Sequence, residues 1–322
     1  MQEWRAGVKD NFGRDIFYLR LSVTDLCNLR CIHCMPEDGV VKRRHEDILS
    51  VDEIEEIVRA AAACGIRKIR VTGGEPLVRG GIIEICRRIS DTRGIRELCL
   101  TTNGILLPKY ADELKAAGVR RLNISLDSLD PETYKRITRN GTLEAALDGV
   151  RIALNAGFDA VKINAVLMGG VNDNEIWRML DLTLRYKVNV RFIEVMPIGQ
   201  CAQWAEERFV SAARVLEAAP ELTDIGVDGV AKIYQLPGGL GTVGLISPIS
   251  SHFCPTCNRI RIAADGMLKP CLHSADEINL RGLHGTELEE AIRSAISQKP
   301  RKHNLDTGEI SASARNMNAI GG

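Results

Sequence analysis

Short β-branched segments alternate with amphipathic segments from residue 17 to about residue 197, and no other feature constrains the fold as strongly. Apolar residues recur at three- and four-residue spacing in the longer segments, which predicts helices. Strands that alternate with helices pair in parallel through right-handed crossovers. Six strand–helix units are too few for a complete eight-unit barrel. The sequence therefore predicts an α/β fold with a partial (β/α)6 TIM-like barrel. The expected strands cover residues 18–24, 68–72, 97–101, 121–126, 160–167 and 189–195, and the expected helices cover 51–64, 82–90, 109–117, 143–156 and 175–186.

The alternation ends after Pro197, which predicts a change of architecture. Beyond it we expect a helix near 211–219, strands near 230–235 and 241–246, and a further helix near 288–297. We therefore predict a barrel domain over residues 1–197 and a C-terminal α+β extension over residues 198–322.

Charge and hydropathy exclude several classes of partner. Lys plus Arg and Asp plus Glu each number 42, so the formal net charge is zero. No global field draws such a chain to nucleic acid or to an anionic membrane. Residues 1–14 contain no apolar core of the signal-peptide type, and no apolar run approaches the roughly 20 residues that span a bilayer. We expect a cytoplasmic protein with neither nucleic acid nor membrane as a partner.

Three of the ten cysteines follow the first predicted strand, in the pattern Cys27-x3-Cys31-x2-Cys34. In a barrel this loop lies at the C-terminal face, where active sites are built. Three thiolates are one ligand short of a tetrahedral zinc site or a cubane iron–sulfur cluster, so the site is open for chemistry. The alternative is a structural zinc that takes His33 or His45 as its fourth ligand, although the spacing is not a common zinc pattern.

A second group of cysteines, Cys254, Cys257 and Cys271, lies in the predicted extension. Clustered cysteines in a cytosolic chain indicate metal ligation rather than disulfide bridges. Arg259 and Arg261 follow at once, and alternation places both on one side of an extended segment. Two guanidinium groups beside a metal site call for an anionic partner, whereas the alternative is a solvated basic strand.

The first cysteine pattern, after a first barrel strand, resembles the radical S-adenosylmethionine superfamily. The resemblance implies that Cys27, Cys31 and Cys34 hold a [4Fe–4S] cluster whose fourth iron binds S-adenosylmethionine. One-electron cleavage then yields a deoxyadenosyl radical that removes a substrate hydrogen. The residues that the resemblance assigns to S-adenosylmethionine are His33 (where an aromatic residue is usual), Gly73, Gly74, Glu75, Ser125 and Met196.

Within the superfamily, the chain resembles the GTP 3′,8-cyclases of molybdenum cofactor biosynthesis. The likeness rests on residues 13–25, Thr101-Thr102-Asn103-Gly104, Ser125-Leu126-Asp127, residues 253–261 and the final Gly321-Gly322. It implies a second [4Fe–4S] cluster on Cys254, Cys257 and Cys271, with GTP as substrate. The product would be (8S)-3′,8-cyclo-7,8-dihydroguanosine 5′-triphosphate. The resemblance assigns GTP binding to Arg20, Arg70, Thr101, Lys162, Arg259 and Arg261, and catalysis to Arg259, Arg261, Gly321 and Gly322.

The same resemblance implies partners. These are a one-electron reductant of the flavodoxin or ferredoxin type and the next pathway enzyme, which forms cyclic pyranopterin monophosphate. The resemblance is also compatible with a homodimer. Two alternatives remain at this point. One is another radical enzyme with an auxiliary cluster, such as a peptide maturase, although those tend to carry more cysteines in the C-terminal domain. The other is a zinc-stabilised binding module without catalysis.

Overall fold

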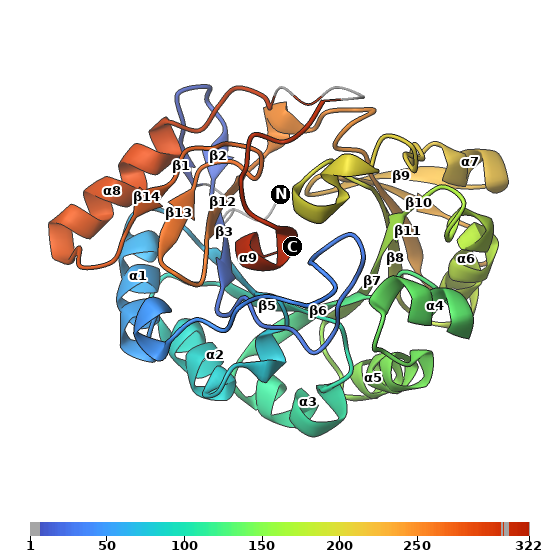
Figure 1. The fold of residues 1–322 in the computed structure, drawn as a ribbon, viewed down its shortest axis with the longest axis horizontal. Coiled ribbons are helices and arrows are strands. Elements are labelled where there is room, and N and C mark those ends of the chain that lie inside the picture. Colours follow the sequence, from blue (N-terminus) through green and yellow to red (C-terminus); the bar gives the residue numbers. More distant parts are fainter. Residues whose placement is uncertain (1–6, 304, 306–308, 322) are drawn as a thin grey trace.

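One continuous sheet forms the centre of the molecule. The computed structural model describes residues 7–303, 305 and 309–321, and within these its twelve strands run in the order β14-β13-β12-β3-β4-β5-β6-β7-β8-β11-β10-β9. The six central strands are parallel, follow chain order and curve into a partial barrel (Figure 1). They are β3 (Tyr18–Ser22), β4 (Lys68–Thr72), β5 (Glu97–Thr102), β6 (Val119–Ser125), β7 (Ala160–Leu167) and β8 (Asn189–Glu194). The predicted fold class is confirmed.

Helices cover the outer side of these strands (Figure 1). The five helices expected in the barrel are present: α1 (Val51–Ala63), α2 (Ile82–Asp91), α3 (Leu107–Ala116), α5 (Leu143–Asn155) and α6 (Ile176–Arg185). The remaining α-helices are α4 (Pro131–Thr138), α7 (Arg214–Ala218), α8 (Gly285–Ser297) and α9 (Met317–Ile320). Short 3-10 helices are η2 (His45–Asp47), η3 (Pro76–Val78), η4 (Asp173–Glu175), η5 (Gly199–Gln203) and η6 (Cys254–Thr256). None of the helices in the described ranges is long and apolar enough to cross a bilayer.

Local signals at the helix ends explain where several helices begin. Ser50 precedes α1, and its hydroxyl accepts a hydrogen bond from the Glu53 N–H at 3.2 Å while the Ser50 N–H donates to the Glu53 carboxylate at 2.7 Å. This reciprocal capping satisfies two N–H groups of the first turn. Helix α4 was not predicted, although Asp130 caps it by accepting from the Thr133 N–H at 2.9 Å. Its eight residues are too few to display a clear periodicity.

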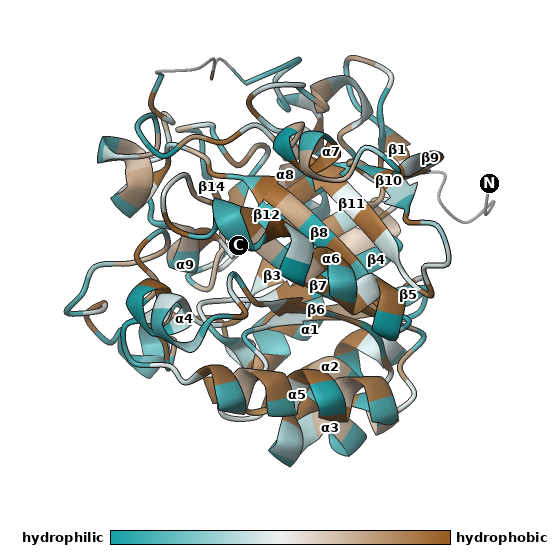
Figure 2. Cartoon of the chain, turned by 90° about the vertical axis from the view of Figure 1, so that its right-hand side faces the viewer, coloured by the Kyte–Doolittle hydropathy of each residue, from teal (hydrophilic) through white to brown (hydrophobic). Residues whose placement is uncertain are grey.

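The hydrophobic core lies between the strands and the outer helices. Leu19, Leu21, Ile69 and Val71 are fully buried or nearly so, and alternate residues of the same strands face the barrel interior. Polar and apolar residues accordingly alternate along the strands and helices in Figure 2. Because the outward side chains supply the core, the inward positions are free to carry polar and charged groups.

The chain after residue 198 extends the barrel sheet at both edges. Strand β11 (Thr242–Ile246) pairs in parallel with β8, and β10 (Ala231–Gln235) and β9 (Thr223–Asp228) continue that edge. Strand β12 (Arg259–Ile262) pairs in parallel with β3 at the other edge, followed by β13 (Met267–Lys269) and β14 (Ile278–Asn279). A separate two-stranded sheet joins β1 (Val8–Lys9) to β2 (Asp15–Ile16). The boundary after residue 197 stays a prediction, but this pairing brings the second cysteine segment beside the first strand.

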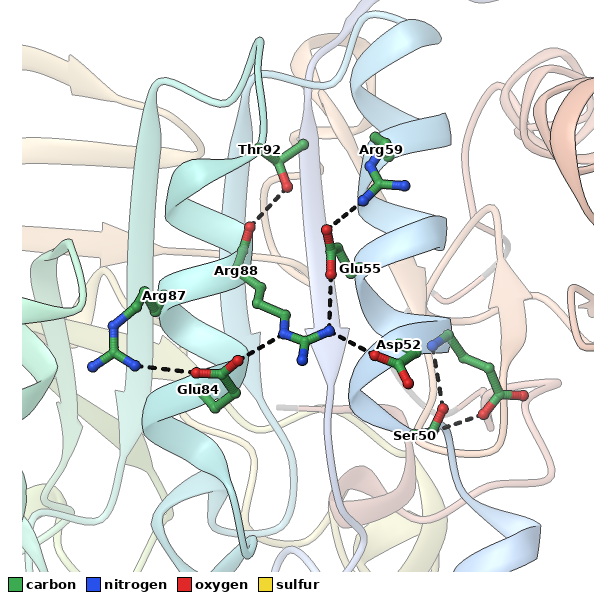
Figure 3. A network of polar contacts seen from close by, with 9 residues as sticks. Ser50, Asp52, Glu55, Arg59, Glu84, Arg87, Arg88 and Thr92 are labelled. Carbon is green, nitrogen blue, oxygen red and sulfur yellow. Dashed lines mark hydrogen bonds and ion pairs between the residues drawn. The ribbon is translucent and has the colours of Figure 1, made fainter.

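A charged network joins α1 and α2 on the outer surface (Figure 3). The Arg88 guanidinium of α2 donates to Glu84 at 2.8 Å, and across to Asp52 at 2.6 Å and Glu55 at 3.0 Å on α1. About a third of the Arg88 side chain is exposed. Solvent screens such pairs, so the network aligns two helices but contributes little to the free energy of unfolding.

A close approach between α5 and the backbone that follows β5 generates a prediction about stability. A Cβ added at Gly149 of α5 would collide with the backbone carbonyl oxygen of Gly104, which follows β5. We expect Gly149→Ala to lower the free energy of unfolding by about 1–3 kcal/mol, because backbone must shift to admit the methyl group. Anaerobic thermal unfolding measures the change. Gly80→Ala is the control, since nothing lies within 4 Å of its added Cβ; equal midpoints for the two variants would contradict the prediction.

Candidate functional site

The first cysteine trio lies in the loop that leaves the C-terminal end of β3. The Ile32 N–H donates to the Ile137 carbonyl at 2.9 Å and the Arg30 N–H to the Thr138 carbonyl at 3.1 Å, which ties the loop to α4. The thiols lie close to one another. Burial raises the pKa of Cys34, and the neighbouring Cys27 raises it further; burial, then Cys34, Asp127 and Cys27, raise the pKa of Cys31. Three half-buried thiols in one loop, without a disulfide among the described cysteines, form a donor set for a metal centre.

Gly73, Gly74 and Glu75 brace this loop. The Gly74 N–H donates to the Thr24 carbonyl and the Glu75 N–H to the Leu26 carbonyl, both at 2.8 Å. A Cβ on Gly73 would stand 2.6 Å from the Thr24 carbonyl oxygen, so the two glycines permit a close backbone approach to the cysteine loop.

The buried Glu75 carboxylate joins the ends of two strands. It accepts from the Thr102 hydroxyl at 2.7 Å, the Asn103 N–H at 2.7 Å and the Leu77 N–H at 3.0 Å. Burial raises the pKa of Glu75 to about 7 against these three hydrogen bonds. Within this structure Glu75 therefore links β4 to β5, and its assignment to S-adenosylmethionine stays a prediction.

The other predicted cofactor contacts lie at the same face of the barrel. Ser125 ends β6, in register with Asn164 of β7. Met196 follows β8 and packs against a small apolar cluster that contains Ile320 of α9. His33 lies 3.8 Å from the Asp127 carboxylate, and its Nδ1 is a buried atom with no hydrogen-bond partner within the described chain.

The second cysteine trio lies around η6 and after β13. Burial and the neighbouring thiols Cys271 and Cys257 raise the pKa of Cys254. Burial raises the pKa of Cys257 as well, but Lys299 and Arg259 outweigh it and bring that pKa down to about 6. The turn of η6 keeps Cys254 and Cys257 adjacent, with the Cys257 N–H donating to the Cys254 carbonyl at 3.2 Å. At Cys257 the nearby cations favour the thiolate form that binds metal.

Histidines also surround Cys254, which the sequence did not indicate. His252, Cys254 and His303 present ligand atoms that all lie within 4.8 Å of one another. His303 stacks on His252 at 4.4 Å between ring centroids and meets His273 edge-on at 4.8 Å. No sequence spacing links residue 303 to this loop, so only the fold could reveal the cluster.

Arginine side chains from three neighbouring strands line the barrel interior in register. Arg20 of β3 is paired with Arg261 of β12 on one side and with Arg70 of β4 on the other. Neighbouring strands lie only about 4.8 Å apart, so like charges stand close together. Burial, opposed by Tyr18 and reinforced by Arg70 and Arg259, lowers the pKa of Arg20 to about 10. Burial, Arg20 and Arg259 lower the pKa of Arg261 strongly. A layer of this kind attracts an anion.

Two more buried cations face the interior from β7 and β8, farther along the sheet. Lys162 of β7 and Arg191 of β8 share one partner, the carboxylate of Asp228 at the end of β9. Burial, then Arg191, lower the pKa of Lys162 to about 8 against the attraction of Asp228. Sequence analysis missed Arg191, yet a signal was present: it stands between the buried Val190 and Phe192, where alternation directs it to the opposite face.

Buried polar atoms without a partner mark the same interior. Thr101 Oγ1, Asn123 Oδ1 and Asn164 Oδ1 have no hydrogen-bond partner within the described chain. Thr101 and Asn123 are paired across β5 and β6, and Asn123 pairs with Lys162. Because buried polar groups are normally satisfied, these atoms mark surface that is shaped for a polar ligand.

Helix α9 sits in the middle of the ring of strands (Figure 1). The Asn318 amide Nδ2 donates to the Asp25 carbonyl at 3.0 Å, and the Asn318 N–H reaches the Cys34 thiol. Three residues on, the Gly321 carbonyl accepts from Arg261 Nη1 at 2.5 Å, and a Cβ at Gly321 would collide with Thr72 Oγ1. The segment therefore contacts groups beside both cysteine trios and places them around one interior. Gly322 lies outside the described residues.

The comparisons with known proteins agree with this arrangement. Residues 21–183 match the radical SAM superfamily, and residues 188–305 match the family described as Molybdenum Cofactor Synthesis C. The chain is 49% identical over 320 residues to the GTP 3′,8-cyclase of Alkaliphilus oremlandii, covering 98% of this chain and 100% of that protein. It is 50% identical over 320 residues to the GTP 3′,8-cyclase of Alkaliphilus metalliredigens, with the same coverage.

A solved structure shows the same fold. Streptococcus suis SuiB bound to its precursor peptide SuiA superposes with a TM-score of 0.62 at 16% identity, over 87% of this chain and 67% of that chain. At that identity the likeness concerns the fold alone.

Fold, cysteine loop and family match together define a radical S-adenosylmethionine enzyme. The full-length identities narrow this further, and the chain belongs to the family of GTP 3′,8-cyclases. This membership removes the zinc-stabilised module without catalysis and disfavours the peptide maturase.

The arginine layer predicts a lowered pKa for Tyr18. The Tyr18 hydroxyl accepts a hydrogen bond from Arg70 Nε at 2.5 Å. Burial alone would raise the pKa of Tyr18, but Arg70, Arg20 and Lys68 together lower it to about 8. We expect one of the five tyrosines to lose its proton as the pH rises through about 8. Ultraviolet titration of the metal-free chain measures this. The transition should vanish in Tyr18→Phe and persist in Tyr234→Phe; a Tyr18→Phe curve identical to the wild type would refute the interpretation.

Proposed function

We propose that this chain converts GTP to (8S)-3′,8-cyclo-7,8-dihydroguanosine 5′-triphosphate, the first step of molybdenum cofactor biosynthesis. Relatives at 49–50% identity over their whole length carry that activity in their names. The observation in this structure that supports it best is the layer of buried cations between two cysteine trios. An interior of that kind suits a polyanionic substrate held beside two metal centres.

The residues present fit the cofactors of such an enzyme. Cys27, Cys31 and Cys34 would hold one [4Fe–4S] cluster with S-adenosylmethionine, and Cys254, Cys257 and Cys271 would hold the other. Three ligands at each trio leave one iron of a cubane open to a small molecule. When bound, these groups supply the one-electron cleavage that starts the reaction. The assignments of His33, Gly73, Gly74, Glu75, Ser125 and Met196 to S-adenosylmethionine belong to the same proposal.

The cations and orphaned polar atoms of the barrel would bind GTP. Arg20, Arg70, Lys162, Arg259 and Arg261 provide charge, and Thr101 provides a hydroxyl. GTP carries roughly four negative charges, and arginine binds phosphate oxygens in a forked geometry. We add Arg191 to this set, because it shares the Asp228 carboxylate with Lys162. An incoming phosphate would compete with Asp228 for both cations.

Enclosure by α9 supports the chemical step. Ile320 and Asn318 of this helix are buried, and the helix lies in the middle of the ring of strands (Figure 1). Holding the reacting groups close converts a bimolecular encounter into an oriented one. Exclusion of water also protects reactive species from side reactions. We place Gly321 and Gly322, together with Arg259 and Arg261, in the catalytic machinery.

The enzyme also needs partners outside its own chain. Its one-electron chemistry requires a reductant, and we propose a flavodoxin or ferredoxin type in the cytoplasm. Its product would pass to the enzyme that forms cyclic pyranopterin monophosphate. A homodimer is compatible with the proposal but is not required by any contact in this chain.

An anaerobic assay with GTP, S-adenosylmethionine and a chemical reductant tests the function. We expect deoxyadenosine and a cyclised guanine nucleotide in equal amounts, from protein that contains about eight irons per chain. Cys271→Ser should keep about four irons and lose cyclisation, whereas Cys86→Ser, at a buried core cysteine, should keep both clusters. A colourless zinc protein, or deoxyadenosine formed at the same rate without GTP, would refute the proposal.

The lowered pKa of Lys162 predicts how GTP affinity depends on pH. Lys162 is charged below its pKa of about 8 and neutral above it. Its ion-pair partner is Asp228, while the positive charges of Arg191 and Arg70 lower its pKa. We expect the Kd for GTP to rise as the pH goes from about 8 to 9, by up to about tenfold for the loss of one charged contact. Equilibrium dialysis measures the Kd. Guanine itself ionises in alkaline solution, so Lys162→Arg provides the reference curve; parallel curves for the two proteins would contradict the prediction.

A further inference from the structure

Six charged side chains form a continuous network between the two cysteine-bearing regions, with Arg315 at its centre. Arg43 donates to Asp25 at 3.0 Å and lies 3.1 Å from Asp265. Arg315 connects Asp265 to Glu277, which also accepts from Lys269 at 3.0 Å. The order along the network is therefore Asp25, Arg43, Asp265, Arg315, Glu277 and Lys269, with the sign of the charge alternating at every step.

The guanidinium of Arg315 uses three of its N–H groups in this network. Nε and Nη2 donate to the two oxygens of Glu277 at 2.7 and 2.6 Å, and Nη1 donates to Asp265 at 2.7 Å. Only 18% of the side chain is exposed. Bidentate arginine–carboxylate contacts with restricted solvent are strong and fix orientation. Lysine could not reproduce them, since it carries a single point charge.

Both anchors of Arg315 belong to the segment that bears the second trio. Asp265 precedes β13 and Glu277 precedes β14, so the two carboxylates bracket Cys271 along the chain. The first trio is reached through Arg43, whose other partner, Asp25, stands two residues before Cys27. Arg315 is therefore connected to both cysteine loops: directly to the second, and through Asp265 and Arg43 to the first.

The residues that follow Arg315 reach the interior. Two residues on, α9 begins; Asn318 binds the Asp25 carbonyl and Gly321 accepts from Arg261. On one side Ile320 packs into an apolar cluster with Met196 and Met317. On the other side lies a cavity of about 700 Å³, lined by Asp25, Arg43, Arg315, Asn318 and neighbouring residues. Since packing is open on this side, polar contacts hold the segment there: the hydrogen bond from Asn318 to the Asp25 carbonyl and the ion pairs of Arg315.

We propose that Arg315 is a positioning residue for the reaction: its contacts with Asp265 and Glu277 hold α9 and Gly321 in the barrel interior, beside both metal centres. The inference rests on the function proposed above, because it gives the inserted helix its task. Arg315 acts on the placement of Gly321 and on the closure of the interior, and does not itself contact the substrate.

The experiment compares wild-type holoenzyme with Arg315→Gln, Arg315→Lys and the control Arg281→Gln. Arg281 forms a partly exposed ion pair with Glu53 at 3.4 Å, outside the ion network of Arg315. Anaerobic hydrogen–deuterium exchange reads the placement of residues 316–321, and GTP kinetics read its consequence. In Arg315→Gln we expect about tenfold faster exchange in this segment and a kcat about tenfold lower, with little change in KM and iron content. Arg315→Lys should recover part of the protection from exchange and part of the kcat, and Arg281→Gln should match the wild type in both.

The partner residue Glu277 supplies a second, independent measurement. If Arg315 acts through this carboxylate, Glu277→Gln should speed the exchange of residues 316–321, and the double variant should add little to either single change. Unchanged exchange in both Arg315 variants would overturn the proposal, as would a lost kcat with the segment still protected. Loss of iron in Arg315→Gln shifts the test to Arg315→Lys. Wild-type protein that does not cyclise GTP would instead refute the proposed function. The hydrogen–deuterium exchange of residues 316–321 would then still test whether Arg315 holds this segment.

Discussion

Repulsion among buried cations is the constraint on which the interior of this barrel depends. Arg261, Arg20 and Arg70 stand in register on three neighbouring parallel strands, about one strand spacing apart. Lys162 and Arg191 add two more positive charges on the other side and share a single carboxylate. A folded chain tolerates such a layer only because the apolar core lies outside the strands, between sheet and helices. The interior is thereby left to bind an anion.

The sheet itself brings the two halves of the site together. Strand β12 joins β3 in parallel, so Arg261 stands beside Arg20, although the two residues are far apart along the chain. At the opposite edge β11 joins β8, and the turn between β9 and β10 places Asp228 against Lys162 and Arg191. The second cysteine segment is therefore an extension of the barrel wall. This continuity explains how two cysteine segments that are distant in sequence meet at neighbouring strands of one barrel.

Helix α9 lies in the middle of the barrel interior (Figure 1). It is only four residues long, too short to be stable by its own hydrogen bonds, so its position depends on side-chain contacts. Apolar packing around Ile320 holds one side, and charged contacts of Arg315 hold the other. The Gly321 carbonyl then meets Arg261, and the absence of a Cβ lets the backbone lie against Thr72. Arg261 thus belongs to the arginine layer and also contacts the C-terminal segment.

The sequence by itself determined the barrel, because strands and helices of that length carry strong periodicities. It also located both cysteine trios and the arginines beside the second, since these are local patterns. It did not reveal α4, which is short, nor the strands β9, β13 and β14, whose pairing is long-range. Arg191 left a faint trace in the alternation of β8, but Asp228, the histidines around Cys254 and the contacts of Arg315 left none. Only the tertiary structure decided these, because hydrogen bonds and ion pairs between segments tens to hundreds of residues apart depend on where strands pair, and pairing partners are not encoded in any local spacing.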